Sequence, residues 1–131
     1  MGDTVTTSVL QEDDYYYVAK FTNQSDGTGE SAVTKIDVSA LTPPAQKVDI
    51  KEITWSTHGV GVDILWDATA NVLAWTVPAN SSGHIDFTQS TGPLSNTQAA
   101  GWTGDVLFTV TGALASAGHG YTIILVCQKK L

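Results

Sequence analysis

The sequence predicts an all-β fold: a single antiparallel β-sandwich or jelly-roll-like barrel of about eight strands covering residues 1–131. Apolar and polar residues alternate with a period of two in many short runs, and clusters of Gly, Pro, Asn and Ser separate these runs. Helical periodicity extends over one turn or so at most. The chain has one cysteine and is long enough to bury a core by packing alone.

Strands are expected in the first half of the chain at 4–10, 15–21, 32–38 and 48–55. The glycine-containing loop at 23–30 predicts that 15–21 and 32–38 form a hairpin. In the last of these segments Ile53 and Trp55 share a face. Every second residue of 15–21 is apolar, and the face thus formed contains Tyr15, Tyr17, Ala19 and Phe21.

The clearest alternation lies at 60–66, where one face is apolar and the other carries Asp63. The apolar face consists of Val60, Val62, Ile64 and Trp66. A strand at 71–77 is expected to pair with it, followed by a short strand at 83–87 and strong strands at 105–111 and 121–128. The last strand is apolar on both faces, which predicts a central position or cover by a partner subunit.

A long polar stretch without periodicity runs from 88 to 103. Loops longer than about 12 to 15 residues in compact domains are usually binding loops or disordered segments, so we expect a contact region here. Trp102 near its end is expected to be exposed or covered by another chain. Trp55 and Trp66 are expected in the core, and the sequence leaves Trp75 open between core and surface.

The charge of the chain indicates which kinds of partner are not expected. All six basic residues are lysines, thirteen acidic residues give a net charge of −7, and the pI is about 4.5. Proteins that bind nucleic acid or anionic membranes rely on Lys and Arg, so neither partner is expected. The first residues contain no basic stretch followed by an apolar run, so no export is expected.

No metal, cofactor or nucleophile is predicted. The three histidines, His58, His84 and His119, each lie beside a glycine, which places them at turns. Cys127 lies in an apolar strand and is expected to be a small buried hydrophobic residue. The loop at 26–30 has the acids and glycines of a calcium loop but lacks the regular ligand spacing.

The remaining candidates for catalytic residues are carboxylates. Asp63, Asp67 and Asp86 could form an acid/base pair of the glycosidase kind. Asp63 falls on the polar face of a strand and Asp67 ends that strand, positions where acids usually serve solubility or turns. We therefore expect no catalytic residues, and a hydrolase built on Asp63 and Asp86 remains the third alternative.

Six stretches together resemble a family of tailed-bacteriophage virion proteins encoded near the major capsid protein. They are KFTN at 20–23, SDGTGES at 25–31, VTKIDV at 33–38, LWDAT at 65–69, TGD at 103–105 and YTIIL at 121–125. Their order and spacing span nearly the whole chain. The resemblance implies a virion structural role, and more specifically capsid decoration, without nominating catalytic residues.

A decoration (cement) protein would bind the major capsid protein at capsomer junctions on the outside of the mature head, and stabilise the head against DNA pressure. We expect a homo-oligomer, a trimer or dimer, assembled in the bacterial cytoplasm and located on the capsid surface, without a cofactor. The rival is a carbohydrate- or receptor-binding β-sandwich of a phage tail or fibre, using Trp102 or Trp75. The candidate interface residues are Tyr15, Tyr16, Tyr17, Trp102, Tyr121, Ile123 and Leu125.

Overall fold

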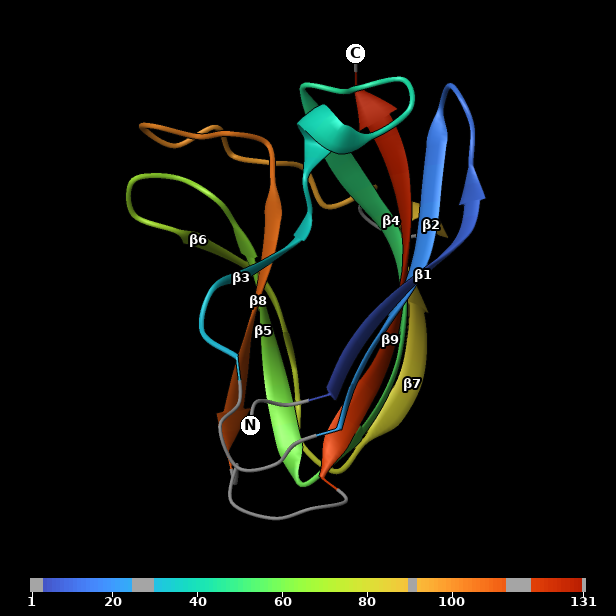
Figure 1. Cartoon of the computed structure of the whole chain (residues 1–131), viewed down its shortest axis with the longest axis vertical. Coiled ribbons are helices and arrows are strands. Elements are labelled where there is room, and N and C mark those ends of the chain that lie inside the picture. The colour runs from blue at the N-terminus through green and yellow to red at the C-terminus, as the bar shows by residue number, and fades with distance from the viewer. Residues whose placement is uncertain (1–3, 25–29, 90–91, 113–118, 131) are drawn as a thin grey trace.

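The computed structural model describes residues 4–24, 30–89, 92–112 and 119–130, which form two antiparallel sheets packed face to face (Figure 1). The predicted all-β sandwich is confirmed. One sheet has five strands, in the order β1 (Thr4–Glu12), β2 (Tyr16–Gln24), β9 (Gly120–Lys130), β4 (Lys47–His58) and β7 (Ser82–Asp86). The other has four, in the order β3 (Val33–Ile36), β8 (Val106–Gly112), β5 (Val60–Trp66) and β6 (Val72–Val77).

Two short 3-10 helices, η1 (Val38–Ala40) and η2 (Phe87–Gln89), are the helical elements of the described residues. The long stretch after η2 forms no strand in its described part. Leu94 makes a reciprocal pair of backbone hydrogen bonds with Ile50 of β4, each 2.9 Å long. This bridge extends the edge of the sheet where β7 ends.

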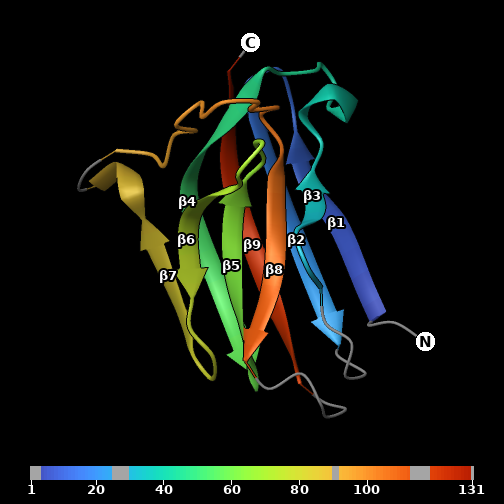
Figure 2. The same ribbon diagram turned by 90° about the vertical axis from the view of Figure 1, so that its left-hand side faces the viewer.

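Strand β9 lies at the centre of the five-stranded sheet, with β2 on one side and β4 on the other (Figure 2). The expectation of a central last strand is confirmed. Its inner face contains Tyr121, Ile123 and Leu125, which are at most 3% exposed. These three residues belong to the core, so the expectation that they form an interface is corrected. The side chains that β9 turns outward include Ile124 and Val126.

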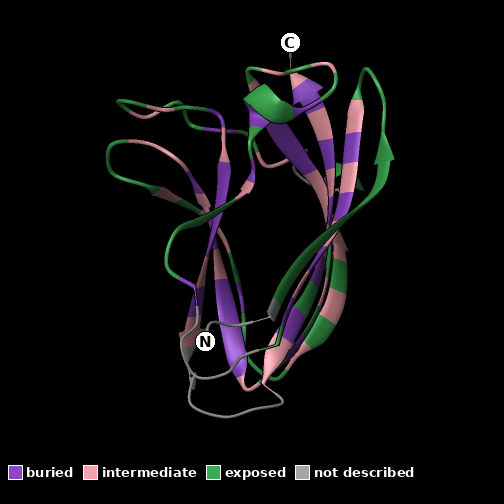
Figure 3. Cartoon of the chain, viewed as in Figure 1, coloured by how far each residue is buried: buried purple, intermediate pink, exposed green. Residues whose placement is uncertain are grey.

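Buried residues occur in both sheets, and several strands alternate between buried and more exposed residues (Figure 3). Most of the buried residues are apolar. The faces predicted for β2 and β5 are confirmed from Tyr17 onward in β2 and throughout β5. Phe108 of β8 packs edge-to-face against Phe21 of β2 and Tyr121 of β9, with ring centroids 5.3 and 5.8 Å apart. These aromatic contacts join the two sheets without a disulfide.

Strand β3 does not form the predicted hairpin with β2. It crosses to the four-stranded sheet and pairs with β8. The physical reason is that β2 already pairs with β1 on one edge and β9 on the other, which leaves no edge for a third strand. Residues Ser25–Gly29 of the predicted hairpin loop lie outside the described residues.

A buried lysine closes the end of the sandwich near the C-terminus. The side chain of Lys129 is fully buried, and its Nζ lies 3.1 Å from both Glu12 Oε2 and the carbonyl oxygen of Pro43. The backbone N–H of Thr42 donates to the same oxygen of Glu12 at 2.6 Å. Partial burial raises the pKa of Glu12, but the hydrogen bonds from Thr42 and Lys129 outweigh it and lower the pKa overall. These contacts tie β1 and β9 to the loop before β4.

Neighbouring isoleucines of β9 provide a direct test of which face is buried. Ile123→Ala should lower the free energy of unfolding by about 2–5 kcal/mol, because it leaves a cavity between the sheets. Ile124→Ala, on the half-buried outer face, should lower it substantially less. Urea unfolding of both variants measures the difference. Equal losses would show that the assigned faces of β9 are wrong.

Candidate functional site

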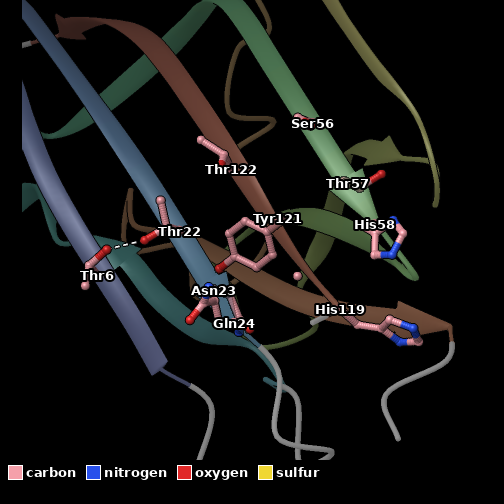
Figure 4. Close-up of a pocket in the computed structure, with 11 residues that line it drawn as sticks. Thr6, Thr22, Asn23, Gln24, Ser56, Thr57, His58, His119, Tyr121 and Thr122 are labelled. Carbon is pink, nitrogen blue, oxygen red and sulfur yellow. Dashed lines mark hydrogen bonds between the residues drawn. The ribbon is translucent and has the colours of Figure 1, made fainter. Parts of the chain in front are cut away.

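A polar hollow of about 500 Å³ lies at the end of the five-stranded sheet where β2 and β4 finish and β9 begins (Figure 4). Most of the residues that line it carry a hydroxyl, amide or imidazole group. The lining includes Thr22, Gln24, Ser56, His58, His119 and Thr122. A smaller hollow of about 280 Å³ shares Ser56, Thr57 and His58 with it and adds Asn80, Ser81 and Ser82. Such a surface suits a ligand rich in hydroxyl groups.

Two histidines meet at this hollow, a proximity that their positions in the sequence did not reveal. The rings of His58 and His119 pack edge-to-face with centroids 5.6 Å apart. Gly59 permits this packing, because it has a φ of +76° and a Cβ there would lie 2.4 Å from the His119 ring. The backbone N–H of Gly59 also donates to Asn80 Oδ1 at 2.7 Å.

The third histidine belongs to another part of the sheet. His84 of β7 lies with its Nε2 2.8 Å from Glu52 Oε1 on β4, and both side chains are well exposed. The three histidines therefore do not converge. Within the described ranges, no group of three or more His, Cys, Asp or Glu side chains could hold a metal ion.

Next to the hollow lies a buried set of polar side chains, which we call the Glu30 cluster: Asn23, Glu30, Lys35 and Tyr121. Asn23 Nδ2 and the Tyr121 hydroxyl donate to Glu30 Oε1 at 2.9 and 2.6 Å. Lys35 Nζ forms an ion pair with Glu30 Oε2, and the Lys35 and Glu30 side chains are 3% and 5% exposed. Asn23 and Tyr121 also line the hollow (Figure 4).

Lys35 points inward because β3 contains a bulge. The pairing of β3 with β8 shifts register between Thr34 and Ile36, so that Lys35 is the extra residue. A bulge redirects a side chain, and here it turns Lys35 inward beside the buried Ile36. Period-two alternation would place Lys35 on the outer face, which is why the sequence pattern did not reveal this cluster.

Asp63 and Asp86, the carboxylates of the hydrolase alternative, lie on opposite sides of the molecule. Asp63 of β5 lies on the outer face of the four-stranded sheet and accepts a hydrogen bond from Thr76 Oγ1 at 3.1 Å. Asp86 of β7 pairs with Glu52 on the outer face of the other sheet. The side-chain hydrogen bond from Thr88 lowers the pKa of Asp86. Because both sheets separate Asp63 from Asp86, they cannot act as one acid/base pair.

None of the four tryptophans is exposed. Trp66 is buried, and Trp55 is partly buried, with its Nε1 donating to Ser81 Oγ at 3.1 Å.

Trp75 packs edge-to-face on Phe87 with centroids 5.0 Å apart. Trp102 is half-buried, and its backbone N–H donates to the carbonyl of Ala99 at 3.0 Å. An exposed Trp102 is therefore not found, and its cover by another chain stays a prediction.

Cys127 is fully buried on the inner face of β9. Burial, with a smaller contribution from the negative charge of Asp49, raises the pKa of its thiol far above the usual value. A thiol that stays protonated is a poor nucleophile. The expectation that Cys127 is a buried residue is confirmed.

Alkylation kinetics test the state of this thiol. Because the folded-state pKa is raised, Cys127 should not react with iodoacetamide between pH 7 and pH 10, whereas the unfolded chain should react rapidly above a pH of about 8.5. Intact-mass measurement with and without urea follows the addition. Rapid labelling of the folded protein, increasing with pH near 8, would contradict the buried position.

A scan against protein-family models finds no match for this chain, and a search of curated proteins finds none either. Over the parts of the chain that the structure describes, no helix is both long and apolar enough to cross a membrane.

Proposed function

We propose that this chain is a tailed-phage capsid decoration protein, which binds the outer surface of the mature head at capsomer junctions and stabilises it. The proposal combines the resemblance in sequence with one structural observation. That observation is the long edge strand β1, which has a single charged residue at its end and carries exposed apolar side chains. Proteins that add a strand to a partner use such an edge.

Strand β1 has nine residues and pairs, in the described part of the chain, with β2 alone. All residues from 5 to 12 are exposed, and Val5, Val9 and Leu10 are 39%, 50% and 53% exposed. Natural edge strands usually carry lysine or proline to prevent pairing with other chains. β1 has neither, and its one charged residue, Glu12, is paired with Lys129. A bulge at Leu10 leaves the segment before it regular.

The three adjacent tyrosines have different environments, and one of them extends this surface. Tyr17 is in the core, and Tyr16 is half-buried with Lys51 Nζ 5.2 Å from its ring centroid. Tyr15 is 65% exposed. The turn that presents it is held by Asp13, whose Oδ1 accepts the backbone N–H groups of Tyr15 and Tyr16 at 2.8 Å. We call Val5, Val9, Leu10 and Tyr15 the β1 surface.

The chemistry of the chain agrees with the outer surface of a head assembled in a reducing cytoplasm. The fold depends on packing and ion pairs instead of disulfides, since its single cysteine is buried. A net charge of −7 disfavours contact with packaged DNA. We therefore propose that the β1 surface contacts either the major capsid protein or a second copy within a homo-oligomer bound to the head.

Lysine substitutions on the β1 surface test the proposal. The variant Val5→Lys with Val9→Lys should lose most binding to emptied capsids assembled from the neighbouring major capsid protein, because lysines on an edge oppose strand addition. Leu73→Lys, at a position on β6 that is 55% exposed, is the control and should bind as the unaltered protein does. Co-sedimentation measures binding, and native mass spectrometry measures the oligomer. A monomeric protein that does not bind capsids would refute the proposal.

A carbohydrate-binding module is the second candidate function, and the polar hollow favours it. The hydroxyl and amide groups around His58 could hydrogen-bond to sugar hydroxyls. The tryptophans are not exposed, however, so they provide no open stacking surface of the kind that many sugar-binding sites use. Without an open stacking surface, carbohydrate binding has less support than capsid decoration.

A glycan array distinguishes the two candidates. If the hollow binds sugars, the unaltered protein should retain a specific glycan, His58→Ala should reduce its retention at least tenfold, and Trp102→Ala should leave it unchanged. Loss with Trp102→Ala alone would instead place the sugar on the long loop. An array with no bound glycan removes this candidate.

A further inference from the structure

We propose that Asn23 and Lys35 join through a side-chain amide (isopeptide) bond, and that Glu30 acts as the catalytic residue for its formation. The product would be a covalent link between the two sheets, since Asn23 belongs to β2 and Lys35 to β3. This inference goes beyond the proposed function and does not depend on it.

The geometry of one carboxylate supports the proposal. Glu30 Oε2 contacts the amine of Lys35, which would be the nucleophile, in a direct ion pair. Glu30 Oε1 lies 2.9 Å from Nδ2 of Asn23, which would be the leaving group. The atom that must lose a proton and the atom that must gain one are therefore bound to the two oxygens of the same group, as general acid–base catalysis requires.

The reacting groups are buried. The Lys35 and Glu30 side chains are 3% and 5% exposed, and Asn23 is 3% exposed. The ring of Phe108 lies 5.9 Å from Lys35 Nζ, and the Tyr121 hydroxyl donates to Glu30 at 2.6 Å. The amine, the carboxylate and the amide are therefore enclosed together by other groups of the protein.

Backbone contacts fix the catalytic residue before any reaction. The carbonyl of Glu30 accepts the N–H of Val110 at 2.9 Å, and the N–H of Ala32 donates to Thr109 Oγ1 at 2.8 Å. Both contacts anchor this segment to β8. The bulge in β3 turns Lys35 toward the same point. The three groups are thus held by separate strands, and the reaction needs Nζ to approach Cγ of Asn23 to about 3–3.5 Å.

The chemical step balances without an oxidant or any further reactant. Glu30 takes a proton from the Lys35 ammonium, and the resulting amine attacks Cγ of Asn23. The Nζ–Cγ bond forms, and the Cγ–Nδ2 bond breaks as Glu30 delivers that proton to Nδ2. Glu30 then carries a second proton from Nζ to the departing ammonia. Two hydrogens from Lys35 and the NH₂ group of Asn23 leave together as ammonium, and Glu30 returns to its carboxylate form.

Peptide mapping of the purified full-length chain tests the bond directly. Trypsin cleaves after Lys20, Lys35 and Lys47, so an unlinked chain gives peptides 21–35 and 36–47. A linked Lys35 resists cleavage, and the expected product is a single peptide 21–47 that is lighter by one ammonia. Fragmentation should locate the link between Asn23 and Lys35. Peptides 21–35 and 36–47 at full mass would overturn the proposal.

Two variants identify the roles of the residues. Lys35→Arg keeps a cation beside Glu30 but cannot form the amide, so it should give peptide 21–35 at full mass and a lower melting temperature. Glu30→Gln keeps the size of the side chain but cannot accept the proton, so it should also give unlinked peptides. A linked product at full yield in Glu30→Gln would contradict the catalytic role of Glu30.

Discussion

The double pairing of β9 is the constraint on which the rest of the sandwich depends. This strand forms hydrogen bonds to β2 and β4 along nearly its whole length, and its inner side chains fill the middle of the core. Since both edges of β2 are then occupied, β3 must join the other sheet. That crossing brings Lys35 and Glu30 next to the end of β2. The Glu30 cluster is thus a consequence of the sheet topology.

Much of the fold could be predicted from the sequence because period-two alternation reports burial directly. It identified the buried faces of β2 and β5, and the two apolar faces of 121–128 identified a central strand. The same two-faced pattern also led to an error, since Ile123 and Leu125 are core residues and not interface residues. Alternation shows that a strand has a buried face. It does not show which other strands lie against that face.

Most of the candidate site could not be predicted, because it depends on contacts between residues far apart in the chain. His58 and His119 are 61 positions apart and meet only because β4 and β9 are neighbours. Lys35 faces the core because of a bulge, and local residue types do not reveal bulges. For β1, the sequence shows directly that the strand has no lysine or proline. It does not show that the strand lies at the edge of a sheet.

Two ion pairs with a buried lysine also change the distribution of charge on the surface. Of six lysines and thirteen acidic residues, Lys35 and Lys129 are buried and each is paired with a glutamate, which leaves four lysines and eleven acids elsewhere. Two copies of such a surface repel each other at low ionic strength, and dissolved ions screen that repulsion. Contacts between copies through β1, whose one charged residue is paired with Lys129, would therefore strengthen as salt is added, whereas complexes held by opposite charges weaken.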